Sequence, residues 1–355
     1  MIALKARTFQ YWKIFKAILF NFFKMPVWFL ALFTGAKSFQ DNPIIGSALL
    51  NRFGLHFWRV RLASLLVQYR RDLLKKSLSK HKQAEYMCNG FTLDFGFLDK
   101  GEFEAIKKEV FESTWLLREM KQGSTITRRV FLNQTELSIR HPKLAAFMAN
   151  LELLSRIRFV AGVGGEPIFS IQAIFSEANT NNDPQMVVHA DTFHANAKAW
   201  FFLENVGEDD GPFAYVPGSH QLTEKRLMWE RRQSISAKYH PIVYHARGSF
   251  RATESDLQEM GLPNPQKMVV PENTLVVADT FGLHCRSNSQ HATCRVEIYA
   301  TLRRNPFLPW VGFDLFSIPY IKRRSGDFSI FFLSCLAKVG LRKMPWKPIG
   351  FGKIK

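Results

Sequence analysis

Two histidines and one aspartate in this chain have the order and spacing of a metal site. His189 and Asp191 are two residues apart, and His284 follows much later. Because side chains two apart on a strand point to the same face, the first pair can converge on one ion. Two histidines and one carboxylate are typical of non-haem Fe(II) sites that keep other coordination positions open. The pattern predicts His189, Asp191 and His284 as ligands of Fe(II), although His189 and Asp191 alone also fit a simple turn cap.

Arg295, eleven residues after His284, is the second chemical signal. It begins a run in which apolar and polar residues alternate, so the arginine stands at the head of a half-buried strand. A buried guanidinium needs an anionic partner. The far carboxylate of 2-oxoglutarate, bound at the iron, would be such a partner. A structural ion pair, for instance with Glu297 or Asp279, is the alternative.

Short strands must position these residues. Runs rich in β-forming residues occupy 125–132, 168–176, 186–188, 198–203, 212–216, 267–270, 274–278 and 295–302. Turn-forming clusters such as 217–219 and 271–273 separate them. Many short strands without long helices between them indicate an antiparallel sandwich or small barrel. We therefore expect a β domain over 86–305, with a helical insertion at 221–262.

The two ends of the chain differ from this domain in charge. Residues 1–85 hold 15 Lys and Arg against 3 Asp and Glu, and residues 302–355 hold 11 against 2. Aromatic and aliphatic residues accompany the N-terminal lysines, and residues 10–33 have one apolar and one basic face. We expect 1–85 to be a basic helical, membrane-associating region and 306–355 a basic, aromatic surface segment. The apolar run 27–33 is too short to cross a bilayer, which needs about 20 residues.

These ends and the cysteines predict where the protein works. Basic, aromatic segments suit the anionic surface of a membrane better than nucleic acid, which is not an expected partner. For the helix expected after residue 54, packing on the domain is favoured, and lipid contact is favoured for 10–33. The four cysteines show no paired spacing and no signal peptide is evident, which favours a cytoplasmic protein bound peripherally to the inner face of a membrane.

The stretch 188–220, VHADTFHANAKAWFFLENVGEDDGPFAYVPGSH, resembles the core signature of the phytanoyl-CoA dioxygenase family of Fe(II)/2-oxoglutarate oxygenases. The segment from His284 to Arg295 resembles that family's distal segment, and the likeness covers about 125–305. It implies a mainly β fold, a double-stranded β-helix with helical additions. It also implies iron ligation by His189, Asp191 and His284, and binding of 2-oxoglutarate by Arg295. Because Asp191 is retained, hydroxylation is favoured over halogenation, whereas Ala190 lacks the polar side chain that many relatives carry there.

Further polar residues have two interpretations each. Gln172 is either a cosubstrate contact or a satisfied core amide. Lys198 shares a strand face with large aromatic residues and needs an anion, from cosubstrate, substrate or a structural pair. Thr293 contacts cosubstrate or satisfies its loop backbone. Arg129 faces an anionic substrate group or solvent. We predict Gln172, Lys198 and Thr293, together with Arg295, as cosubstrate-binding residues.

Three functions compete at this point. The first is a dioxygenase that uses O₂ and 2-oxoglutarate to hydroxylate an aliphatic C–H of a small-molecule, lipid-like or lipid-linked substrate at a membrane surface. The second is a catalytically inactive, cupin-like binding protein of the same fold. The third is a basic nucleic-acid-binding protein, which would bind with a steep salt dependence. The complete set of metal and cosubstrate residues favours the first.

Overall fold

The computed structural model describes residues 24–178, 183–312, 318, 321, 324–338 and 344–355. Most of the predicted membrane segment 10–33 therefore lies outside the described residues. Its remainder is helical over residues 24–30 and continues into a 3₁₀ turn, Ala31–Phe33. Among the described residues, no helix is long and apolar enough to cross a bilayer.

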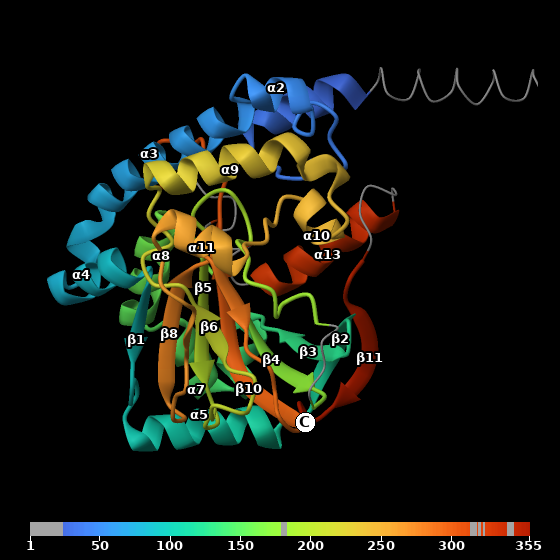
Figure 1. Cartoon of the computed structure of the whole chain (residues 1–355). Coiled ribbons are helices and arrows are strands. Elements are labelled where there is room, and N and C mark those ends of the chain that lie inside the picture. The colour runs from blue at the N-terminus through green and yellow to red at the C-terminus, as the bar shows by residue number, and fades with distance from the viewer. Residues whose placement is uncertain (1–23, 179–182, 313–317, 319–320, 322–323, 339–343) are drawn as a thin grey trace, which may run out of the picture.

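The fold is mainly β with helical additions, as predicted, and its larger sheet has eight antiparallel strands (Figure 1). Their order across the sheet is β1 (Phe91–Asp94), β8 (Thr274–Asp279), β5 (Ala197–Phe202), β10 (Thr293–Leu302), β4 (Ile168–Ser176), β3 (Thr125–Phe131), β2 (Trp115–Gln122) and β11 (Lys347–Gly352). A smaller sheet holds β7 (Gln266–Lys267), β6 (Phe213–Tyr215) and β9 (His284–Arg286). His189 extends the smaller sheet through isolated bridges to His284 and Arg251. Together the sheets form the expected double-stranded β-helix.

The two faces of the larger sheet bury different cores, as the alternation along β5 shows. Phe201 packs with Ile171 and Val277 in the core under the helices. Its neighbour Trp200 points the other way, into an aromatic layer with Phe213 of the smaller sheet. Because side chains alternate along a strand, β5 supplies both cores.

Helices surround the sheets. The helices before β4 are α2 (Ala48–Arg52), α3 (Leu55–Leu74), α4 (Lys80–Asn89), α5 (Lys100–Glu112), α6 (Gln134–Arg140), α7 (Pro142–Met148) and α8 (Leu151–Ala161). The expected insertion 221–262 contains α9 (Glu224–Ser236), α10 (Val243–Ala246) and α11 (Glu254–Met260), and α13 (Ser325–Lys338) lies between β10 and β11 in the chain. Helices α2, α3 and α9 lie together above one end of the sheets, and α5 lies at the other end (Figure 1).

Three local predictions differ from the structure. Of the predicted strand 267–270, only residue 267 lies in a strand, β7. The run 186–188, predicted as a strand, is a turn that ends in the bridge at His189. The C-terminal segment contributes β11, which pairs with β2 at the edge of the larger sheet. Its Pro348 and Gly350 are residue types depleted in strands, and the register shifts between them, so no strand signal is visible in the sequence. The segment 306–355 thus contains one strand of the larger sheet.

Candidate metal centre

Backbone pairing fixes the three predicted metal ligands. His189 and His284 exchange two backbone hydrogen bonds, each 2.9 Å long. The backbone N–H of Asp191 donates to the carbonyl of Thr280 at 2.9 Å, so the loop that carries Asp191 is also held. These bonds tie residues far apart in the sequence into one rigid frame at the edge of the smaller sheet.

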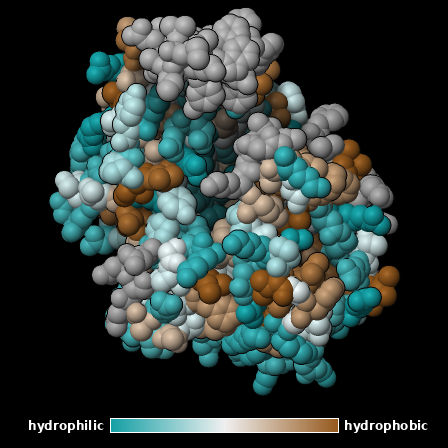
Figure 2. Space-filling view, turned by 90° about the vertical axis from the view of Figure 1, so that its right-hand side faces the viewer, coloured by the Kyte–Doolittle hydropathy of each residue, from teal (hydrophilic) through white to brown (hydrophobic). Residues whose placement is uncertain are grey.

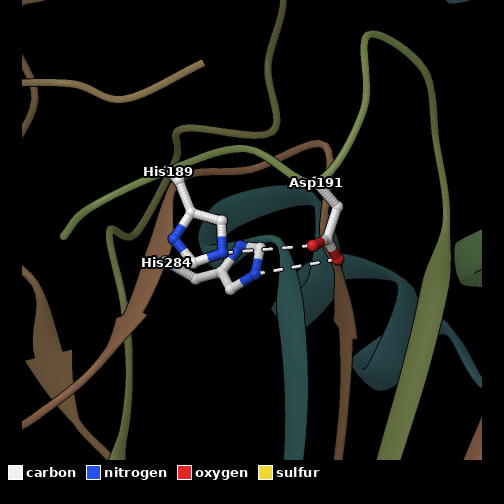
Figure 3. A group of neighbouring side chains, drawn as sticks. All are labelled: His189, Asp191 and His284. Atoms are coloured by element: carbon white, nitrogen blue, oxygen red, sulfur yellow. Dashed lines mark ion pairs between the residues drawn. The ribbon is translucent and has the colours of Figure 1, made fainter. Parts of the chain in front are cut away.

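The ligand atoms converge in this frame (Figure 3). One atom each from His189, Asp191 and His284 lies within 4.8 Å of the others. His189 Nε2 is 4.0 Å from Asp191 Oδ1, and His284 Nε2 is 3.7 Å from Asp191 Oδ2. The structure thus brings together the three residues predicted from the sequence.

The other nitrogen of each imidazole is engaged by backbone. His189 Nδ1 lies 2.7 Å from the Val187 carbonyl, and His284 Nδ1 lies 2.9 Å from the Gly282 carbonyl. A carbonyl can only accept, so each Nδ1 carries the proton and donates, which leaves the Nε2 lone pair directed at the shared position. Backbone orientation of ligand histidines is the usual supporting shell of protein metal sites. Two imidazole nitrogens and a carboxylate oxygen fit Fe(II).

Burial and neighbouring charges set the protonation of this group. Burial lowers the pKa of His189 well below its usual value and also lowers that of His284. Burial alone would raise the pKa of Asp191, but Lys198 and the two histidines together hold it well below its usual range. Neutral imidazoles beside an ionised carboxylate are the protonation states that a metal ion requires of its ligands.

Lys198, predicted to bind cosubstrate, pairs with Asp191 in the structure. Its Nζ lies 2.5 Å from Asp191 Oδ2. Burial alone would lower the pKa of Lys198, but Asp191 raises it above its usual value. The ammonium therefore stays charged directly beside the candidate ligands.

The ligands open onto a cavity of about 200 Å³ between the two sheets. Its walls combine cationic and aromatic side chains with the metal group: Arg129, Lys198, Arg286, Arg295, Trp200, Phe213 and Tyr299. On the side of the molecule that carries β2 and β11, hydrophilic residues border a hollow, and hydrophobic residues are scattered over the rest of the face (Figure 2). The cavity thus combines an aromatic wall with several cationic side chains.

Arg295 lines this cavity, but it already has a carboxylate partner. Its Nε donates to Glu297 Oε2 at 3.0 Å, and its Nη1 donates to the Gly211 carbonyl at 2.9 Å. Its Nη2 makes no hydrogen bond to any described residue. Gln172, also predicted as a contact, donates through Nε2 to Glu297 and accepts from Arg129. The ion pair between Arg295 and Glu297, which the sequence offered as the alternative to cosubstrate binding, is therefore present. The Nη2 of Arg295 is left for a ligand.

Thr293 is not brought to the metal group. It lies two residues before Arg295 at the start of β10, does not line the cavity that holds His189, and faces a separate hollow with Glu204 and Asn205. Its hydroxyl lies 3.3 Å from that of Ser289. The alternative interpretation, a hydroxyl that satisfies its own loop, describes its position.

Three cationic residues near the metal group are not among those predicted from the sequence. Lys37 donates from Nζ to the Asp191 carbonyl, and burial lowers its pKa to about 8. Arg286 lines the cavity and pairs with Asp183 at 2.6 Å. Arg251 bridges to His189 through the backbone. Only Arg286 has a sequence signal, because two residues after His284 on a strand means the same face.

Part of the chain matches a known protein family. Residues 86–241 match the family model described as phytanoyl-CoA dioxygenase. This range includes His189 and Asp191, whereas His284 and Arg295 lie beyond it and join the site through the fold. No curated protein matches the chain.

Several solved structures are similar at low identity. HygX from Streptomyces hygroscopicus, solved with nickel, 2-oxoglutarate and hygromycin B, is 15% identical over 63% of this chain and 86% of HygX, with a TM-score of 0.40. The epimerase SnoN, in complex with Fe³⁺, alpha ketoglutarate and nogalamycin RO, is 17% identical over 65% of this chain and 90% of SnoN, with a TM-score of 0.39. The carbocyclase SnoK from nogalamycin biosynthesis is 18% identical over 64% of this chain and 84% of SnoK, with a TM-score of 0.38.

The family match agrees with the resemblance found in residues 188–220 and with the fold around them. Similarity to the phytanoyl-CoA dioxygenase family model thus covers residues 86–241, somewhat less than half of the chain.

Proposed function

We propose that this protein is an Fe(II)- and 2-oxoglutarate-dependent dioxygenase that hydroxylates an aliphatic C–H of a lipid-like or lipid-linked substrate at a membrane surface. The observation that carries the proposal is the convergence of His189 Nε2, His284 Nε2 and the Asp191 carboxylate within 4.8 Å. Both imidazoles are oriented by backbone carbonyls, so the donor set is prepared for a metal before one binds.

The cofactors supply the oxidation and the protein supplies their placement. Iron and 2-oxoglutarate, when bound, would supply the chemistry that inserts one oxygen atom of O₂ into a C–H bond, with succinate and CO₂ as the other products. His189, Asp191 and His284 would hold the metal. The Nη2 of Arg295 would hold the far carboxylate of 2-oxoglutarate, and Gln172 keeps Glu297 in place beside it.

The aromatic walls select the substrate and exclude water. Trp200 and Phe213 lie with ring centroids 4.4 Å apart, and Phe213 lies 5.8 Å from the His284 ring. An apolar wall this close to the metal ligands favours an aliphatic group over a polar one. Support for the membrane comes from the ends: Val27, Phe29 and Leu30 are exposed, next to a strongly basic N-terminal region.

One observation favours the second candidate, a binding protein of the same fold without turnover. The Lys198 ammonium, 2.5 Å from Asp191 Oδ2, competes with a metal ion for the same carboxylate. If this pair persists, the site holds no iron and binds only an anionic small molecule. Anaerobic Fe(II) titration of the full chain separates the two candidates, because only the dioxygenase binds iron.

The test of activity is succinate release that depends on Fe(II) and 2-oxoglutarate. We expect His189→Ala and Asp191→Ala to abolish it, since each removes a ligand. His291→Ala is the matched control, because this histidine is exposed and lies outside the metal group. Succinate release that survives both ligand substitutions contradicts the proposal.

A further inference from the structure

Helix α3 buries several arginines and exposes an apolar stripe, unlike an ordinary surface helix. Its buried face includes three arginines, Arg59, Arg70 and Arg71, none more than 6% exposed. Its outer face carries a continuous apolar stripe, each member between 48% and 61% exposed: Trp58, Leu62, Leu65, Tyr69 and Leu73. Positions three and four apart share one face of a helix, so these five side chains form a single surface.

The buried arginines explain why the helix cannot turn its apolar face inward. Arg71 pairs with buried Asp279 at 2.8 Å, and Arg70 donates to the carbonyls of Gly162 and Leu308 at 2.7 and 2.6 Å. Arg59 donates to the Ala36 carbonyl at 2.7 Å. Breaking such buried contacts costs several kcal/mol. These contacts therefore fix the orientation of α3, so the apolar stripe faces outward.

The surroundings of the stripe are cationic. Between residues 47 and 80, five basic side chains are exposed against one acidic side chain: Arg52, Arg61, Lys75, Lys76 and Lys80 against Asp72. Phe53, the residue that follows α2 and lies five positions before Trp58, is also exposed, by 78%. From Trp58 to Leu73 it measures about 22 Å along the helix axis.

We propose that this α3 stripe is the surface by which the protein lies on an anionic lipid bilayer. Tryptophan and tyrosine prefer the boundary between headgroups and acyl chains, leucines enter the chains, and the flanking cations meet anionic headgroups. A second copy of the chain is a poorer occupant, because a stable interface takes about 20–30 residues from each side. The inference deepens the proposed function, on whose membrane location it rests, and it places the lipid contact on a helix for which the sequence favoured packing.

The experiment is vesicle co-sedimentation of the full chain with phosphatidylcholine vesicles, with and without phosphatidylserine. We expect Leu62→Gln combined with Leu65→Gln to weaken binding at least about tenfold, because two leucines lose their apolar burial. Glutamine keeps helix propensity close to that of leucine, so the fold is retained. The matched control is Ile139→Gln with Leu151→Gln, which removes two exposed apolar side chains from α6 and α8.

Two further measurements sharpen the result. Arg61→Gln with Lys75→Gln is expected to reduce the preference for phosphatidylserine about tenfold or more, at about 1 kcal/mol for each cation. Acyl-brominated lipid is expected to quench tryptophan fluorescence in the wild type and much less in Trp58→Phe. Iron-dependent turnover of 2-oxoglutarate without vesicles is expected to be unchanged in all these variants, so failure of the stripe and failure of the proposed function are distinguishable.

Three outcomes would overturn the inference. Undiminished vesicle binding by the Leu62, Leu65 variant would assign the lipid contact to another segment. Wild-type protein that ignores vesicles and forms a dimer, which the same variant dissociates, would assign the stripe to a second copy. Wild-type protein that does neither would show that the stripe has no such partner.

Discussion

The two ends of the cavity satisfy their charges in different ways. At the metal end, two neutral imidazoles and Asp191 point at one another, and Lys198 pairs with the Asp191 carboxylate. At the far end, Arg295 pairs with Glu297 and Arg286 pairs with Asp183, so these two cations each have a carboxylate of their own. The metal end gains most from an added cation, whereas an anion at the far end must share Arg295 with Glu297. Metal affinity and cosubstrate affinity therefore depend on different competing charges, Lys198 for the metal and Glu297 for the cosubstrate.

Removing Arg295 should have the largest effect, because it leaves a buried carboxylate without its partner. Glu297 is fully buried, and Arg295 is nearly so. We expect Arg295→Met to lower the free energy of unfolding by about 3–5 kcal/mol, the usual cost of breaking a buried ion pair from one side. Urea unfolding measures this value. Lys267→Met, which breaks an exposed pair with Glu208, is the control and should change it by less than about 1 kcal/mol. Equal losses would mean that the far end is not compensated internally.

Removing the competitor at the far end should act in the opposite direction on ligand binding. Glu297→Gln keeps the shape of the side chain and removes its charge, so the Arg295 guanidinium becomes free for a carboxylate. We expect 2-oxoglutarate to bind about tenfold more tightly, with a stability loss of about 1–3 kcal/mol from the altered hydrogen bonds. Calorimetric titration checks the first value. Unchanged affinity would indicate that Arg295 does not meet the cosubstrate.

Much of the fold could be predicted because the alternation of residue types along the strands is visible in the sequence. The runs that became β3, β4, β5, β8 and β10 lie within a residue or two of their observed bounds. The strand β11 could not be predicted, since its proline and glycines carry no strand signal and its pairing with β2 depends on residues more than 200 positions earlier.

The reversed polarity of α3 was also invisible in the sequence. Periodicity shows that a helix has two faces, but partners decide which face is inside, and Asp279 lies far from Arg71 along the chain. The helix packs on the domain through the face that carries Val60, Val67 and the buried arginines, and its leucine stripe lies outside.

The metal ligands were predictable because spacing alone puts His189 and Asp191 on one side, and the distal motif supplies His284. For the Arg295 guanidinium, the sequence allows two anionic partners, the cosubstrate carboxylate or a structural ion pair. Strand parity allows both, since Glu297 two residues later shares its face. Thr293 shares that parity too, but it lies one step further from the metal group, outside the cavity lining.

Removing Lys198, the cation that competes with a metal ion for Asp191, tests the metal end of the cavity. In Lys198→Met, the Asp191 carboxylate loses the ammonium that lies 2.5 Å away and becomes available to a cation. We expect Fe(II), titrated without 2-oxoglutarate, to bind about tenfold more tightly, equivalent to about 1.4 kcal/mol. Lys267→Met again serves as the exposed control. Weaker iron binding would show that Lys198 supports the metal end instead of competing with it.

The smallest effect concerns pH, and it follows from burial at the metal end. A free imidazole is half protonated near pH 6.5, so an exposed histidine site loses metal as the pH falls through that value. Burial lowers the pKa of His189 and His284, so both stay neutral below pH 6.5, and Asp191 stays ionised because its pKa is lowered too. We therefore expect Fe(II) affinity to change by less than about threefold between pH 7.5 and 6.5 and to decline only at lower pH. The buried pairs at the far end should keep 2-oxoglutarate affinity constant over the same range, so an early loss of iron alone would mean that the ligand histidines are more open to water than their packing implies.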